Sequence, residues 1–135
     1  MRYSSDVWRI LNVDEDATVV WDVQSLNLYD NAECSGPTLT SADTVSNYID
    51  SGHLAGGGYG PEKAFDNNPD SIWGGRPDGS NNLYLGVIFK VNVEVKCAVF
   101  LDGNSNGQNI SKQATLQMQD DNQNWVDVES LLGRP

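Results

Sequence analysis

Residues 64–73 read AFDNNPDSIW, and this stretch decides how the rest of the chain is interpreted. An apolar pair opens it, Trp73 closes it, and most of the residues between them carry side-chain oxygens. Such a dense set of oxygens on a tight loop can converge on calcium, which takes about six to eight oxygen ligands, some of them backbone carbonyls. Asp and Asn side chains on such a loop also bond to their own backbone in Asx turns. The stretch therefore predicts a tight loop and leaves open whether its oxygens bind an ion or the loop itself.

Strand patterns flank this loop on both sides. The later part of residues 18–29 alternates, with Val23 and Ser25 facing one side and Leu26 facing the other. This period of two predicts a strand that is half-buried in a sheet. Further strands are predicted at residues 7–12, 45–50, 84–91, 94–101, 114–119 and 125–128, with a turn at 92–93.

Glycine and proline interrupt residues 53–82, so a long helix is not expected there. One helical turn is predicted at residues 61–64, because Pro61 suits the first position of a helix. Closely spaced strands joined by turns predict an all-β sandwich. Its core is expected to contain the tryptophans and other apolar residues, namely Trp8, Trp21, Trp73, Trp125, Phe65, Leu85, Val87, Phe89, Val99, Leu101, Leu116 and Met118.

Length and charge narrow the functional class. The chain has 135 residues, which suffices for a single domain over residues 1–135 with one core. Its net charge of -11 argues against nucleic acid and anionic membranes as partners, because phosphate contacts need Lys and Arg. No stretch approaches the roughly 18 apolar residues that a membrane span requires. Cys34 and Cys97 either form one disulfide in an oxidising compartment or remain reduced, with Cys97 buried in an apolar run.

Three segments occur in the order that is typical of one family. AFDNNPDSIW at residues 64–73 is followed by YLGVIF at 84–89 and LQMQDDNQNW at 116–125. In this order they resemble the discoidin domains, also called coagulation factor V/VIII C-type domains, which include galactose-type carbohydrate-binding modules. IDSG at 49–52 and NGQNI at 106–110 look like further segments of that family. The resemblance implies a galactose-binding-domain-like jelly-roll β-sandwich in a secreted or cell-surface protein.

Both ends of the chain depart from the family layout. Family members continue beyond the hairpin that contains Trp125 and end on a strand that this C-terminus lacks. The segments VWRILN at residues 7–12 and VQSLNLYD at 23–30 resemble those missing closing strands. We therefore expect a circular permutation in which residues 8–29 complete the same two-layer sandwich. The alternative is a truncated domain with an unrelated extension, whose exposed strand edges would favour aggregation.

The resemblance also implies a structural calcium ion at residues 64–73. The positions that match the family's ligands are Asp66, Asn68 and Ser71, together with nearby backbone carbonyls. Ser25 occupies the position of a Glu that often completes the site in the family. Because a charged ligand is lost there, the predicted calcium site is weaker than the family pattern.

The ligand site departs further from the family. Sugar-binding members carry a His directly after the loop Trp and an Arg ahead of the Asn-Gly loop, whereas Gly74 and Asp102-Gly103 occur here. A pyranose is recognised by an aromatic surface and by planar hydrogen-bonding groups. Candidates chosen by their loop positions are His53, Tyr59, Arg76, Asn82 and Asn106. Their ordinary alternatives are a solvated His, a Tyr that covers the core, and an Arg that pairs with a surface carboxylate.

Recognition without catalysis is the expected function. His53 is the only histidine, and the sequence has no nucleophile motif, zinc motif or phosphate-binding loop. Two functions remain. The first is a lectin-like, carbohydrate-binding module stabilised by calcium. The second is a structural domain for cell adhesion or assembly that contacts another extracellular protein.

Overall fold

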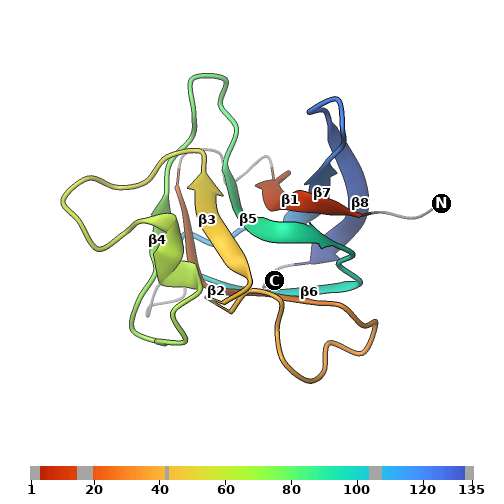
Figure 1. The fold of residues 1–135 in the computed structure, drawn as a ribbon. Helices are drawn as coiled ribbons and strands as arrows, with labels where there is room; N and C mark the ends of the chain where they lie inside the picture. The colour runs from red at the N-terminus through yellow and green to blue at the C-terminus, as the bar shows by residue number, and fades with distance from the viewer. Residues whose placement is uncertain (1–3, 15–19, 42, 104–107, 133–135) are drawn as a thin grey trace.

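The computed structural model describes residues 4–14, 20–41, 43–103 and 108–132 of the chain. The described strands form two antiparallel sheets, which Figure 1 shows as two layers, with β2 and β6 running beneath β5 and β1. The larger sheet has the order β3 (Val45–Asp50), β5 (Tyr84–Val93), β1 (Ser5–Asn12), β7 (Gln113–Gln119) and β8 (Trp125–Leu132). The smaller sheet has the order β4 (Trp73–Gly75), β2 (Trp21–Tyr29) and β6 (Cys97–Asp102). A single 3-10 turn, η1 (Pro61–Ala64), is the only helical element in these ranges. The predicted all-β sandwich is confirmed.

The N-terminal strands occupy interior positions of both sheets. β1 pairs with β5 on one side and with β7 on the other. β2 likewise pairs with β4 and with β6. The prediction that residues 8–29 complete the two-layer body is therefore confirmed for the part that the structure describes, since residues 15–19 lie outside it.

The core lies between the two sheets and is centred on three tryptophans. Trp8, Trp21 and Trp73 are fully buried, and the rings of Trp21 and Trp73 meet edge to face at 5.7 Å. Other predicted core residues are also buried, namely Leu85, Val87, Phe89, Leu116 and Met118, while Phe65 is partly buried against them. Edge-to-face contacts add about 0.5–1.5 kcal/mol beyond the burial of apolar area.

Trp125 was predicted to lie in the core, and this prediction is wrong. Residues paired across antiparallel strands point to the same face, and Trp125 pairs with Gln119 on β7. Met118 faces the core, so its neighbour Gln119 and the paired Trp125 face outward. Trp125 is therefore half-buried on the outer surface of the larger sheet.

Val99 and Leu101 were also predicted to be core residues and are instead 47% and 42% exposed. Both lie on β6, where Ala98 and Phe100 are the residues that pack against the core. The alternation of the strand sends Val99 and Leu101 to the outside. Apolar residues occupy both the inward-facing and the outward-facing positions of β6, so composition alone does not show which set faces the core.

A β-bulge in β2 changes the alternation that the sequence indicates. The pairing of β2 with β6 shifts between Val23 and Ser25. Val23 is consequently buried on the same side as Leu26 and Leu28, although strict alternation placed it on the opposite side. Ser25 stays on the outer side of the smaller sheet, where it pairs with Leu101.

The predicted strands occur where the sequence places them, but several boundaries differ, and β8 extends to Leu132, beyond the predicted end at residue 128. β5 continues through Val93, so the predicted turn at residues 92–93 is wrong, and β6 begins at Cys97 instead of residue 94. β4 was not predicted, because its three residues WGG are too short and too rich in glycine to carry a strand signal. The bounds of β3 and of η1 match the prediction.

The loop after β2 is tied to the start of β6. Cys34 and Cys97 form a disulfide in the structure, with Cα atoms 5.4 Å apart. The Leu39 amide also donates to the Leu28 carbonyl, so the loop folds back on the strand from which it leaves. In the described ranges, no helix is long and apolar enough to cross a membrane.

Candidate functional site

Polar side chains gather where β3 ends and β4 pairs with the segment after it. His53 forms an isolated antiparallel bridge with Gly75. On either side of this bridge, the Arg76 amide donates to the Gly52 carbonyl and the Leu54 amide donates to the Gly74 carbonyl. The segment after β3 thus lies along β4, which brings His53 and Arg76 to the same short strand.

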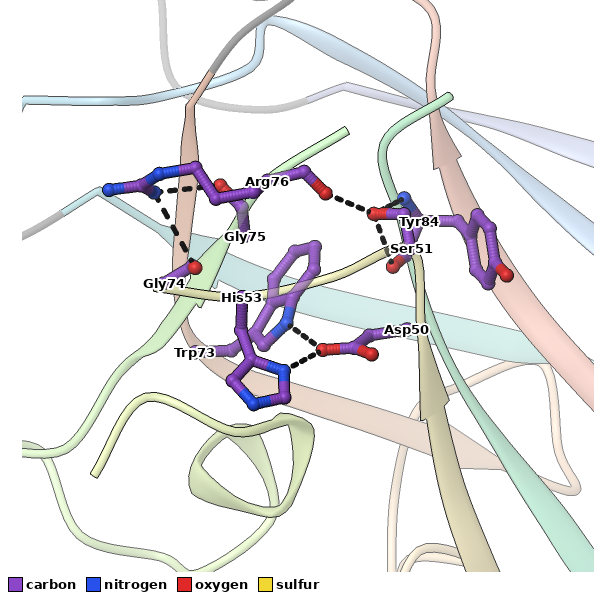
Figure 2. Close-up of polar contacts among 8 residues, drawn as sticks. All are labelled: Asp50, Ser51, His53, Trp73, Gly74, Gly75, Arg76 and Tyr84. Carbon is purple, nitrogen blue, oxygen red and sulfur yellow. Dashed lines mark hydrogen bonds and ion pairs between the residues drawn. The ribbon is translucent and has the colours of Figure 1, made fainter. Parts of the chain in front are cut away.

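Ser51 fastens this arrangement to the larger sheet. Its hydroxyl donates to the Arg76 carbonyl at 2.8 Å and accepts a hydrogen bond from the Tyr84 amide at 3.1 Å (Figure 2). One side chain therefore joins the end of β3, the end of β4 and the start of β5. This contact gives a structural role to the IDSG segment, which the sequence singled out as family-like.

The Asp50 carboxylate holds both an indole and an imidazole. Its Oδ2 accepts a hydrogen bond from Trp73 Nε1 at 2.9 Å and lies 2.7 Å from His53 Nδ1 (Figure 2). Because an ionised carboxylate only accepts, Nδ1 is assigned as the donor, and Nε2 is then the acceptor of the neutral ring. The His53 side chain is 43% exposed, whereas that of Asp50 is 14% exposed. Asp50, which is itself held by the buried Trp73, thus fixes the orientation of an accessible imidazole, so His53 is not simply solvated as the alternative interpretation supposed.

Arg76 presents a cation directly after Gly75, the residue of β4 that pairs with His53. One of its terminal nitrogens donates to the Gly75 carbonyl at 2.9 Å, and the side chain is half-buried. No carboxylate of the described residues pairs with it, so the predicted alternative of a surface ion pair is not observed there. A guanidinium has five N–H donors, and most of them stay available to a ligand. In Figure 2 the guanidinium points away from the imidazole of His53, so the two groups flank β4.

Tyr59 packs against the backbone of β4. The Gly74 amide donates to the Tyr59 carbonyl, and a Cβ on Gly74 would approach the Tyr59 side chain to 3.3 Å. A Cβ on Gly75 would lie only 2.4 Å from the ring of Trp73. The two glycines therefore give the aromatic rings room on either side of β4, and Tyr59 covers the strand as its alternative interpretation predicted.

The last two candidates are not brought to this place. Asn82 is exposed at the end of a loop that Asp78 closes, and no described contact joins it to His53, Tyr59 or Arg76. Asn106 lies outside the described residues. The structure thus assembles three of the five predicted ligand residues and adds Asp50. Asp50 belongs to the family-like IDSG segment but was not among the ligand candidates, because a lone Asp at a strand end carries no distinctive signal.

The predicted metal loop is closed by its own side chains. Asp66 Oδ1 accepts the Asn68 amide at 3.0 Å, and Asn68 Oδ1 accepts the Asp70 amide at 3.0 Å. These are the Asx turns of the alternative interpretation. Ser25 and Asn68 line one pocket, which Asp66 and Ser71 do not line.

The chemistry of this donor set is nevertheless compatible with calcium. All four predicted ligands offer oxygen atoms. The oxygens that accept a hydrogen bond in the Asx turns each have a second lone pair, which remains available. Asp66 is the only carboxylate among the four, and the described chain contains no cluster of three or more His, Cys, Asp or Glu residues that could hold a metal. A calcium ion bound mainly by such neutral oxygens would be held weakly.

One further cluster was missed in the sequence. The Arg9 guanidinium lies between the rings of Tyr84 and Trp125, 4.6 Å and 3.8 Å from their centroids. Its Nε donates to Gln117, and burial lowers the pKa of Arg9. Alternation in β1 places Arg9 opposite the buried Trp8, and this signal could have identified it as a residue of the outer face.

Comparison with known proteins gives one match. A family model described as the F5/8 type C domain matches residues 41–133. No curated protein and no solved structure matches the chain. The match begins after β2, so β1 and β2 lie outside it although both are interior strands of the sheets. Both the permutation and the alternative of an N-terminal extension predict such a match, so the permuted order stays a prediction.

Proposed function

Because the chain belongs to the F5/8 type C, or discoidin, family, we propose that it is a non-catalytic module that binds carbohydrate through the loops around β4. Domains of this family are recognition modules that often bind carbohydrate or phospholipid, and they occur mostly in extracellular or surface proteins. The observation that carries the proposal is the pair of His53 and Arg76, which lie at the same end of β4, where Asp50 orients the imidazole and the Gly75 carbonyl holds the guanidinium.

Each group has a role that suits a sugar. In its neutral form the His53 ring accepts a hydroxyl hydrogen at Nε2, and the N–H groups of Arg76 donate to hydroxyl or carboxylate oxygens. The Asp50 carboxylate keeps the imidazole from rotating, which lowers the entropy that binding would otherwise cost. Tyr59 supplies an aromatic surface beside them.

Catalysis is not part of this proposal. A His held by an Asp also occurs in catalytic triads, where the other ring nitrogen bonds to a nucleophilic hydroxyl or thiol. Over the described ranges, no Ser, Thr or Cys side chain is hydrogen-bonded to His53. Family members are generally non-catalytic binding modules, which supports the same conclusion.

A glycan array tests the carbohydrate proposal. The intact protein is expected to bind a restricted set of saccharides, and His53→Ala and Arg76→Ala are each expected to weaken binding about tenfold, since each removes a hydrogen bond of about 1–2 kcal/mol. Lys90→Ala removes an exposed cation elsewhere and serves as the matched control. Equal binding by His53→Ala, Arg76→Ala and Lys90→Ala would contradict the assignment of this site.

An adhesion or assembly role is the second candidate. It is favoured by Gly74, which replaces the His of sugar-binding members, and by exposed apolar residues such as Val91 and Val99, 67% and 47% exposed. Such residues favour contact with another protein when they are grouped. Light scattering over a range of protein concentrations distinguishes the two functions, because a silent array together with concentration-dependent assembly would support the second.

We also propose a structural calcium ion at residues 64–73, with Asp66, Asn68, Ser71 and Ser25 as candidate ligands. When bound, the ion would cross-link this loop to β2 and stabilise the folded state. Millimolar calcium is expected to raise the melting temperature over that in EDTA, and Asp66→Ala is expected to remove the difference. Asp70→Ala, in the same loop but outside the predicted ligand set, is the matched control. An equal melting temperature with calcium and with EDTA would overturn the proposal.

A further inference from the structure

A pocket of about 210 Å³ opens on the outer side of the smaller sheet. Its sheet side is formed by Gln24, Ser25 and Asn27 of β2 and by Leu101 of β6. Asn67, Asn68 and Pro69 of the neighbouring loop form the opposite wall. None of these residues belongs to the His53 and Arg76 site, whereas Ser25 and Asn68 are also candidate ligands of the proposed calcium ion.

The lining of this pocket carries no ionisable side chain, although the chain has a net charge of -11. A charged ligand needs a partner of opposite charge to offset the loss of its hydration. The pocket offers only amides, a hydroxyl and apolar groups, so its ligand is expected to be neutral.

Several of the polar groups in the lining have no other partner. The hydroxyl of Ser25 and the amides of Asn27 and Asn67 form no hydrogen bond with any residue of the described ranges. Gln24 donates from Nε2 to the Gly103 carbonyl, which leaves its Oε1 available. Asn68 uses Oδ1 to accept the Asp70 amide, which leaves its Nδ2 available. The pocket therefore offers both donors and acceptors, and every amide is planar.

The apolar part of the pocket lies beside these groups. Leu101 is 42% exposed and pairs with Ser25 across the strands, while Pro69 adds an apolar ring from the loop. A pyranose has an apolar face and a rim of hydroxyls that both donate and accept hydrogen bonds. We propose that this pocket binds one neutral pyranose unit, as a second saccharide subsite distinct from the site around β4.

Protein NMR with simple sugars tests this proposal on the intact chain. Uniformly ¹⁵N-labelled protein in EDTA is titrated separately with methyl glycosides of galactose, glucose and mannose and with glucuronic acid. At least one neutral glycoside is expected to produce saturable shifts in the side-chain amide signals of Asn27 and Asn67. Glucuronic acid is expected to produce none, because the pocket offers no cation.

Two variants remove the polar contacts without disturbing the backbone. Asn27→Ala shortens a side chain on β2, and Asn67→Gly suits a residue whose φ is 56°. Each is expected to raise the dissociation constant about fivefold, the usual effect of one hydrogen bond. Asn122→Ala, an exposed amide in the turn before β8, is the matched control, and His53→Ala is expected to leave these shifts unchanged.

The outcomes separate this pocket from the other proposals. The proposal is overturned if no neutral glycoside shifts the Asn27 and Asn67 signals, or if the shifts persist with unchanged affinity in both pocket variants. Loss of the shifts in His53→Ala would move the ligand to the site around β4. Shifts that appear with calcium chloride but with no glycoside would assign the pocket to the cation and would likewise overturn the proposal.

Discussion

At the scale of single residues, Asp102 is a buried carboxylate that supports the core of the smaller sheet. It is 1% exposed, and its Oδ2 accepts hydrogen bonds from Trp21 Nε1 at 3.0 Å and from the Ser111 amide at 2.6 Å. Its Oδ1 has no partner among the described residues. One oxygen thus connects the central Trp21 to the segment that leads into β7.

Substitutions of Asp102 are expected to differ sharply. Asp102→Ala leaves two buried donors without an acceptor and should lower the free energy of unfolding by about 2–4 kcal/mol. In Asp102→Asn the side-chain oxygen can still accept both hydrogen bonds, and the NH₂ group takes the place of Oδ1, which accepts none. The free energy of unfolding should therefore fall by clearly less than in Asp102→Ala. Urea denaturation followed by tryptophan fluorescence measures the free energy of unfolding of both variants. If it falls equally in the two, the hydrogen bonds of Asp102 are not the source of its stabilising effect.

At the scale of elements, the loop between β4 and β5 is organised by Asp78. Its Oδ1 accepts the amides of Ser80 and Asn82 at 2.8 Å and 3.0 Å, while the Asp78 amide donates to the Asn82 carbonyl. The backbone hydrogen bonds from Asn82 and Ser80 hold the pKa of Asp78 below its ordinary value. The short sequence between Pro77 and Leu83 thus closes on itself and leads directly into β5.

The lowered pKa of Asp78 has a defined effect on stability. Because its pKa is lower in the folded state than in the unfolded state, its contribution is fully present above the unfolded value and is lost as the pH falls through the folded value. Asp78→Asn is therefore expected to reduce the loss of stability on acidification. The difference between the melting temperatures at neutral and acidic pH measures this loss of stability. Asp121→Asn, which removes an exposed carboxyl in another turn, is the control. A titration of the Asp78 side chain by NMR with a midpoint at the ordinary value would contradict the expectation.

At the scale of the whole molecule, the two N-terminal strands hold the sheets together. Without residues 1–29, β5 and β7 lose β1 as their common neighbour, and β4 and β6 lose β2. The shortened chain is expected to be unfolded or aggregated, since unpaired strand edges favour association. A rearranged chain that begins at residue 30 and carries residues 1–29 after residue 135, joined by a flexible linker, is expected to fold with the Cys34–Cys97 disulfide intact.

Circular dichroism and size-exclusion chromatography of the two chains check this prediction. Folding of the rearranged chain would show that the position of these strands in the sequence is exchangeable, as a permuted family member requires. A folded, monomeric protein from residues 30–135 alone would contradict the role assigned to β1 and β2.

Local patterns in the sequence determined the elements and the class of the fold. Alternation identifies a strand wherever one face is apolar, as in β7, and Pro61 marks the start of η1. The ordered segments at residues 64–73, 84–89 and 116–125 indicate the family, because they combine turn chemistry with strand spacing. Cys34 and Cys97 were identified as a possible pair from their number alone.

Only the tertiary structure decided which faces, ends and partners these elements have. The outward positions of Trp125 and Leu101 depend on the register with β7 and β2, because paired residues share a face whatever their polarity. His53 is placed near Asp50 because the chain turns after β3 and the following segment pairs with β4. The sequence of β4, WGG, carries no strand signal, so this pairing could not be predicted. Such features arise from pairings between distant segments, and a local pattern contains no information about which distant segment will supply the partner.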